Sequence, residues 1–165
     1  MRQGRRFVTS LGLVLLLGIA LALSPANPAA SARGMRAIEV APPESLIGDW
    51  LTQGGDGVIA IERCGPNLCG RIVGILRAPS EPVPTDVHGA SQCGLTILHN
   101  EKVTDDGFWQ GEITDPRDGT TYGAQLWLDE HGDLNLRGFL GIPLLGRTQV
   151  WHRFTGTITQ SCGIA

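Results

Sequence analysis

Short runs of apolar and β-branched residues alternate with polar positions along most of the chain. In residues 122–129, for example, Tyr, Ala, Leu and Leu alternate with Gly, Gln, Trp and Asp. A period of two places successive side chains on opposite faces, so such runs predict half-buried strands. Outside the N-terminal segment, no helical repeat of about 3.6 residues persists for two turns. We expect strands at residues 47–52, 58–63, 70–76, 94–99, 108–114, 120–128, 134–139 and 148–154.

Turn-forming residues separate these runs. Asp-Asp-Gly at residues 105–107, Asp-Pro-Arg-Asp-Gly at 115–119 and Glu-His-Gly-Asp at 130–133 are typical of tight connections. A longer loop over residues 78–92 begins with three prolines within seven residues, and prolines do not fit inside a sheet. Short strands at this regular spacing predict an all-β domain, either an antiparallel barrel or a sandwich.

The N-terminal segment follows a different pattern. Arg2, Arg5 and Arg6 precede an almost unbroken apolar run over residues 8–23, and Ala-Ser-Ala at residues 30–32 is a typical signal peptidase site. The run is shorter than the ~20 residues that span a bilayer. We therefore expect residues 1–32 to be a cleaved signal peptide, rather than a retained anchor. Residues 33–45 are expected to be a flexible lead-in, and residues 46–165 a single domain.

Composition and charge agree with this division. Glycine accounts for 23 of 165 residues and charged residues for 18%, which disfavours a helical bundle. Loss of the signal would remove three arginines and no acidic residue, so the net charge of −3 would become about −6. An acidic chain has no basic patch for phosphates, so we expect no nucleic-acid partner. We expect a protein without a transmembrane anchor after signal cleavage, in the periplasm or secreted.

Four cysteines follow the predicted cleavage site. Disulfides are the usual state of paired cysteines outside the cytoplasm. Cys64 and Cys69 flank the turn tetrapeptide Gly-Pro-Asn-Leu between two predicted strands, which places them opposite each other in a hairpin. Cys93 and Cys162 then pair by default, although four cysteines allow three connectivities. The spacing does not match that of a structural zinc site.

Two residues at the ends of the predicted domain resemble those of a known barrel class. Gly48-Asp49-Trp50 opens the first strand and Arg153 ends the last one. A Gly-x-Trp at the first strand with an arginine near the end of the last is similar to the lipocalin and calycin barrels. The resemblance implies that Arg153 packs over the indole of Trp50 and closes one barrel end, as a cation–π contact.

The joint pattern resembles a bacterial family more closely. The residues that carry this resemblance are Gly-Asp-Trp-Leu-Thr at 48–52, Cys-Gly-Pro-Asn-Leu-Cys-Gly-Arg-Ile-Val at 64–73, Cys-Gly-Leu at 93–95, Asp-Pro-Arg-Asp-Gly-Thr-Thr-Tyr at 115–122, Arg-Gly at 137–138, and Gly-Arg-Thr-Gln-Val-Trp-His-Arg at 146–153. In order and spacing they are similar to domain-of-unknown-function family 2147, over about residues 46–154. The resemblance implies a secreted β-barrel of roughly this length, with no assigned catalytic residue. Together with the strand and cysteine patterns, it leads us to expect a small antiparallel up-and-down barrel of about eight strands, stapled by disulfides.

No catalytic motif stands out. The four histidines are scattered along the chain, and neither a nucleophile elbow nor a His-x-x-x-His spacing is present. Asp115 and Asp118 are compatible with paired carboxylates, but Asp-Pro-x-Asp-Gly is foremost a turn sequence. We expect a protein that is not an enzyme and that uses no cofactor or metal.

Two functions remain. In the first, which we favour, the barrel binds a small apolar molecule or lipid, since an eight-stranded barrel has room for one small ligand. The candidate ligand and interior residues are then Trp50, Arg71, Gln149, Trp151 and Arg153. In the second, the barrel is fully packed, and the protein is an envelope structural or protein-interaction module. An open or a filled barrel interior distinguishes the two.

Overall fold

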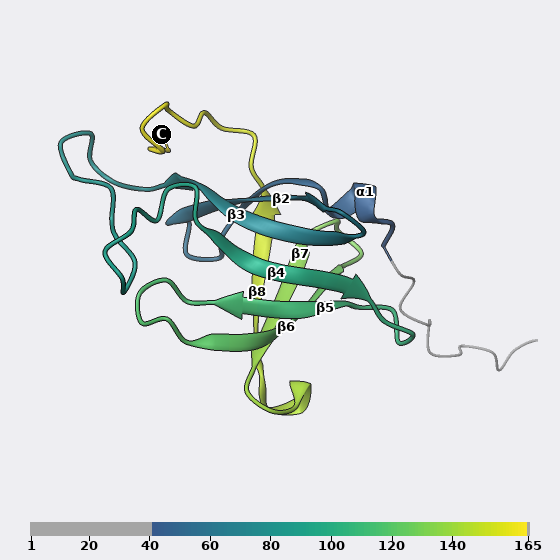
Figure 1. Cartoon of the computed structure of the whole chain (residues 1–165). Coiled ribbons are helices and arrows are strands. Elements are labelled where there is room, and N and C mark those ends of the chain that lie inside the picture. The colour runs from purple at the N-terminus through teal and green to yellow at the C-terminus, as the bar shows by residue number, and fades with distance from the viewer. Residues whose placement is uncertain (1–40, 165) are drawn as a thin grey trace, which may run out of the picture. The chain divides into compact units, whose positions relative to one another are not determined.

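The structure, a computed structural model, describes residues 41–164 and contains a closed barrel of eight antiparallel strands (Figure 1). The strands are β1 (Gly48–Leu51), β2 (Gly57–Cys64), β3 (Asn67–Ile75), β4 (Thr96–Val103), β5 (Trp109–Thr114), β6 (Thr121–Leu128), β7 (Leu134–Phe139) and β8 (Arg147–Arg153). Two short helices accompany them, α1 (Pro43–Leu46) and the 3₁₀ helix η2 (Pro143–Leu145). No helix in the described part of the chain is long and apolar enough to cross a membrane.

Each strand pairs with its neighbours in the sequence. The last strand closes the barrel against the first through the pairs Trp50–Arg153 and Leu51–His152. The order from β1 to β8 therefore has no crossover, and the expected up-and-down barrel is confirmed. The alternative of a sandwich is excluded, because the sheet closes on itself rather than forming two layers.

Alternation along the strands produces the core. In β3, Leu68, Gly70, Ile72 and Gly74 are buried, and the residues between them are partly exposed. The buried side chains pack into one cluster: Leu46, Trp50, Ile59, Ile61, Leu68, Ile72, Ile75, Ile97, Leu98, Trp109, Ala124, Leu126, Leu134, Leu136 and Trp151. Side chains of every strand contribute to this cluster.

The β4 strand differs from the expected one. The sequence pattern predicts a strand at residues 94–99, whereas β4 runs from Thr96 to Val103. Its pairing with β5 slips by one residue between His99 and Lys102, and its pairing with β3 slips between the partners of Leu68 and Gly70. Such a bulge inserts an extra residue and turns the strand locally. The polar residues 100–102 obscured this extension, because their pattern is not that of a half-buried strand.

The segment before β1 also differs from expectation. Residues 43–46 form α1, where Pro43 suits the first helical position and Glu44 the first turn. Leu46 is fully buried, and Ala41 packs against the core. The described part of the expected flexible lead-in therefore belongs to the barrel domain. The expected signal peptide, residues 1–32, and residues 33–40 lie outside the described residues.

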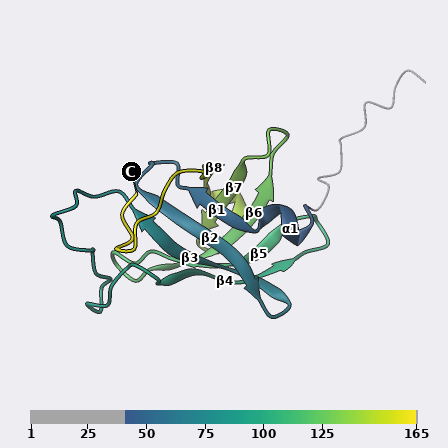
Figure 2. The same ribbon diagram turned by 90° about the horizontal axis from the view of Figure 1, so that it is seen from above.

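Two disulfides join the cysteines as expected. Cys64–Cys69 links β2 to β3, with 5.8 Å between the Cα atoms. Cys93–Cys162 links the β3–β4 loop to the C-terminal segment, with 6.0 Å between the Cα atoms. That segment also bridges β3 through Ile75–Gly163, so it lies beside the end of β3 and the long β3–β4 loop (Figure 2).

The connectivity gives the barrel two distinct ends. We call the α1 end the one that carries α1 and the β2–β3, β4–β5 and β6–β7 turns. We call the loop end the one that carries the β1–β2, β3–β4, β5–β6 and β7–β8 connections. The long β3–β4 loop and the β7–β8 loop with η2 extend from the strands in Figure 1.

Candidate functional site

The α1 end is closed by a stacked arginine. The Cζ atom of Arg153 lies 3.8 Å from the ring centroid of Trp50, whose side chain is fully buried. Arg153 also donates hydrogen bonds to the Ile47 and Ser45 carbonyl oxygens, and the Trp50 Nε1 donates to the Leu46 oxygen at 2.8 Å. Partial burial lowers the pKa of the Arg153 guanidinium from its ordinary value. The contact expected from the sequence is present and ties α1 to the barrel.

Gly48 makes that closure possible. Its φ of +129° is one that L side chains rarely adopt, and a Cβ atom there would lie 2.5 Å from Arg153 Nη1. The glycine of the Gly-x-Trp motif thus leaves room for the guanidinium. The motif and Arg153 form one structural unit at this end.

The other residues expected to line a ligand site are dispersed. Trp151 is buried in the core, and its Nε1 donates to Gln149 Oε1 at 2.9 Å. Gln149 is exposed, although it alternates with Trp151 as expected. The expectation that Arg71 lines the interior is wrong. Arg71 lies on the outer face of β3, between the buried Gly70 and Ile72, and its Nε is 3.5 Å from Glu62 Oε1. These side chains do not form one group in the barrel interior.

A small pocket lies at the loop end, next to the edge of the core. Its volume is about 130 Å³, and its lining includes His88, His99, Thr96 and Thr114. The β3–β4 loop closes one side, held by the hydrogen bond from Val87 N to Pro116 O at 3.0 Å. Polar groups of three segments converge here, in a space suited to a few water molecules or one small ion.

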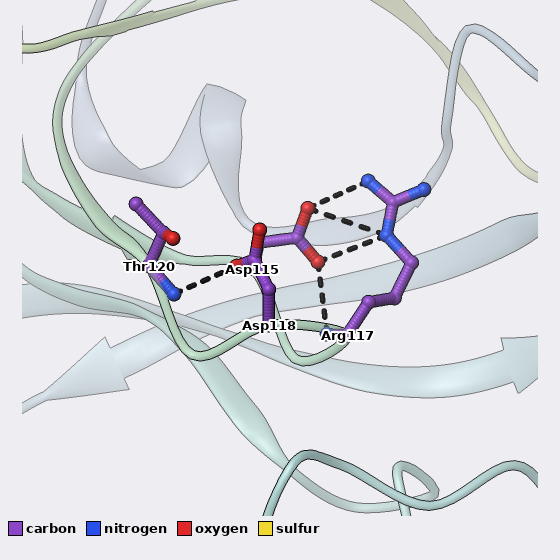
Figure 3. Close-up of polar contacts among 4 residues, drawn as sticks. All are labelled: Asp115, Arg117, Asp118 and Thr120. Carbon is purple, nitrogen blue, oxygen red and sulfur yellow. Dashed lines mark hydrogen bonds and ion pairs between the residues drawn. The ribbon is translucent and has the colours of Figure 1, made fainter.

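The Asp115–Gly119 turn supports this pocket. Asp115 accepts hydrogen bonds from the Arg117 backbone N at 2.9 Å and from its guanidinium Nη2 at 2.6 Å, and Asp118 accepts from Thr120 N at 2.8 Å (Figure 3). The Arg117 hydrogen bonds hold the pKa of the Asp115 carboxyl below its ordinary value. Both carboxylates therefore organise the turn, as their sequence favoured.

A second pocket lies beside the C-terminal segment. Its volume is about 260 Å³, and its lining includes Arg77, Pro79, Thr159 and Ile164. Arg77 donates to the Ser161 and Glu81 carbonyl oxygens, both at 2.6 Å. The guanidinium is thus engaged in joining the loop to the C-terminal segment, rather than directed at an open site.

Glu101 is a buried acid that the sequence analysis did not identify. Its side chain is 1% exposed, and neither carboxylate oxygen has a hydrogen-bond partner among residues 41–164. Burial, together with the charge of Glu112, raises the pKa of Glu101 to about 9. It is therefore a neutral carboxylic acid at pH 7. Nothing in the sequence around His-Asn-Glu-Lys distinguishes it from a surface residue.

The β7–β8 loop carries a group of exposed aliphatic side chains. Leu140, Ile142, Leu144 and Leu145 are 64%, 54%, 81% and 76% exposed. We call residues 140–145 the apolar tip. The sequence did carry a signal for it, because Leu-Gly-Ile-Pro-Leu-Leu is an apolar run between two predicted strands, where a connection is normally polar.

In the part of the chain that the structure describes, no three His, Cys, Asp or Glu side chains lie close enough together to hold a metal ion. The expectation of a protein without metal or cofactor stays a prediction.

Comparison with known proteins identifies one family. Residues 48–153 match the family described as "Uncharacterized protein conserved in bacteria (DUF2147)". The match spans all eight strands and both the Gly-x-Trp motif and Arg153. No curated protein and no solved structure matches the chain.

Proposed function

From the premise that the chain belongs to this uncharacterized bacterial family, we propose that it is a non-enzymatic interaction module outside the cytoplasm. In this proposal the filled barrel is a rigid scaffold, and its outer surface contacts another component of the cell envelope. This is the second of the two functions expected from the sequence.

The filled interior is the observation that carries the proposal. The three tryptophans Trp50, Trp109 and Trp151 and their aliphatic neighbours occupy inward positions on every strand. The two pockets described above, of about 130 and 260 Å³, are smaller than the ~300 Å³ at which ordinary small-molecule sites begin. The small inward residues leave no free space for a ligand, because neighbouring side chains fill it: a Cβ atom on Gly70 would lie 2.5 Å from Leu98, and one on Gly111 2.8 Å from Glu101.

The disulfides support a location outside the cytoplasm. Both cysteine pairs are bonded, and structural disulfides persist in oxidising compartments. The N-terminal pattern of arginines, an apolar run and Ala-Ser-Ala points the same way. Mass spectrometry of the exported protein tests this part: we expect an N-terminus at Arg33, and an intact N-terminus in the cytoplasmic fraction contradicts it.

A ligand titration tests the filled barrel. The exported protein is titrated with an apolar fluorescent probe and with benzene, while tryptophan emission and the melting temperature are recorded. We expect neither a saturable change in emission nor a rise in melting temperature for the natural protein. Saturable binding with one site per chain would overturn the proposal and restore the ligand-binding barrel.

A cavity variant provides the matched control. Leu126 is fully buried, and Leu126→Ala removes three carbon atoms from the core. Such a cavity remains dry and binds benzene, which raises the melting temperature by mass action. If Leu126→Ala does not fold, Ile61→Ala in the same cluster serves instead. Benzene binding by the variant alone shows that the assay detects an open interior.

A further inference from the structure

The apolar tip is the largest departure from an ordinary surface in the described part of the chain. Four large aliphatic side chains are exposed within six consecutive residues, and the segment 138–146 contains no charged residue. Isolated exposed leucines are common, but a contiguous group of this kind indicates a contact surface. The loop with η2 extends beyond the ends of β7 and β8 (Figure 1).

Several backbone groups of the tip form hydrogen bonds with one another. The carbonyl oxygens of Leu140 and Ile142 accept from the backbone N of Ile142 and of Leu145. The Pro143 oxygen accepts from Gly146 N at 2.9 Å. Pro143 itself has no N–H to satisfy. Three carbonyl oxygens of the tip therefore have backbone partners within the loop.

Arg137 of β7 donates further hydrogen bonds to the backbone of the tip. Its Nε donates to the Pro143 oxygen at 2.6 Å, and its Nη2 donates to the Leu144 oxygen at 3.2 Å. Its Nη1 donates to Thr148 Oγ1 at 2.9 Å, which fixes the guanidinium against β8. The carbonyl oxygens of Leu140, Ile142, Pro143 and Leu144 thus all accept hydrogen bonds, while the large aliphatic side chains of the tip are exposed.

We propose that the apolar tip inserts into the interfacial layer of a lipid bilayer, with Arg137 and Arg147 at the level of the lipid phosphates. This inference rests on the proposed function and names the envelope component as a lipid surface. Insertion to the boundary between headgroups and acyl chains, about 5–10 Å deep, buries side chains of this length.

Two observations favour a bilayer over a protein partner. First, backbone groups that enter an apolar phase need hydrogen-bond partners, and four of the six carbonyl oxygens of residues 140–145 have partners within the protein. Second, the tip is purely aliphatic, whereas protein interface cores are enriched in aromatic residues. The two arginines at its base form no ion pair with any acid among residues 41–164. The nitrogens of Arg137 donate to the Pro143, Leu144 and Thr148 oxygens, so the exposed Arg147 is the one that can contact a phosphate directly.

Sedimentation with vesicles tests the inference. The probe is a vesicle of phosphatidylethanolamine and phosphatidylglycerol at 3:1, and the exported protein is used with its N-terminus verified by mass. We expect the natural protein to sediment with the vesicles. Leu144→Asn/Leu145→Asn should lower the partition coefficient by at least about tenfold, because each exposed leucine contributes apolar area to binding.

The chain offers a closely matched pair of single variants. Ile142 in the tip and Val103 in β4 are 54% and 53% exposed, and Val103 lies at the α1 end. Ile142→Asn should weaken vesicle binding several-fold, whereas Val103→Asn should leave it within about twofold of the natural protein. Arg147→Gln should weaken binding to these anionic vesicles more than to phosphatidylcholine vesicles. Unchanged melting temperatures show that the variants are folded.

The negative results separate the two proposals. The bilayer proposal is overturned if the natural protein stays in the supernatant, or if the tip variants bind as well as it does. It is also overturned if sedimentation equilibrium shows a dimer that only the tip variants disrupt, because the tip then contacts a second copy. None of these results bears on the proposal of a filled barrel, which the ligand titration tests separately.

Discussion

The Glu101 carboxyl group lies where a side chain at position 111 would have to be. A Cβ atom on Gly111 would be 2.8 Å from Glu101 Cδ and Oε1, and 2.4 Å from the His99 carbonyl oxygen. Gly111 alternates with the buried Trp109 and pairs with the buried Ala124, so this contact is on the inner face of the barrel. The bulge of β4 directs Glu101 inward, and the two small residues on β5 and β6 leave space on that face.

Stability should depend on pH through Glu101. The unfolded chain loses this proton near pH 4.5, whereas the folded protein keeps it until about pH 9. Between these values the folded state binds more protons, so stability falls as pH rises. Glu101→Gln should therefore stabilise the protein by roughly 3 kcal/mol at pH 7 and by little at pH 4. Urea unfolding at several pH values measures the difference.

Glu112→Gln provides the accompanying measurement. Glu112 is exposed, and its charge contributes to the raised pKa of Glu101. Removing this charge should lower the pKa of Glu101 in the folded protein. The pH range over which stability falls should then end at a lower pH, but it should still be present. Equal pH dependence in the natural protein and in Glu101→Gln would show that Glu101 is not the buried acid that titrates here.

Gly111 should tolerate no side chain. Gly111→Ala forces the new methyl group against a backbone oxygen and the Glu101 carboxyl, so we expect a loss of about 1–3 kcal/mol in the free energy of unfolding. Gly138→Ala is the control, because a Cβ atom there meets nothing within 4 Å. It should change stability by less than about 1 kcal/mol, through the unfolded state. Equal effects of the two substitutions would contradict the close approach at Gly111.

Arg153 should stabilise the barrel through its contacts, beyond its charge. Arg153→Met removes the contact with Trp50 and the hydrogen bonds to Ser45 and Ile47, and we expect a loss of about 2 kcal/mol in urea unfolding. Arg153→Lys keeps the charge but not the planar group, so it should recover only part of the loss. If Arg153→Lys recovers all of the lost free energy of unfolding, the positive charge alone accounts for the stabilisation, and the prediction is wrong.

The two disulfides should differ in value. Cys93–Cys162 closes a loop between residues that are 69 positions apart in the sequence, and Cys64–Cys69 closes one between residues 5 positions apart. The chain-entropy relation gives about 4 and about 2 kcal/mol. The double variant Cys93→Ser/Cys162→Ser should therefore lose about twice as much stability as Cys64→Ser/Cys69→Ser. A thiol assay of the denatured, unreduced protein should detect no free thiol, and any free thiol contradicts the pairing.

Local patterns were sufficient for much of the fold. Alternation along residues such as 122–128 predicts which face of a strand is buried, because the direction of each side chain follows from the local backbone. Tight-turn sequences such as Asp-Pro-Arg-Asp-Gly likewise act within a few residues. The eight strands, the two cysteine pairs and the stacking of Arg153 on Trp50 were all expected before the structure, the last of these from a resemblance.

The tertiary structure alone decided what the barrel contains and presents. Whether an interior is open depends on the register of all strands and on the sum of the side-chain volumes, which no single segment encodes. The burial of Glu101 follows from a bulge whose effect depends on β3 and β5, and its raised pKa follows from that burial. The apolar tip was visible in the sequence as Leu-Gly-Ile-Pro-Leu-Leu, but its exposure depends on the hairpin that carries it beyond the strands.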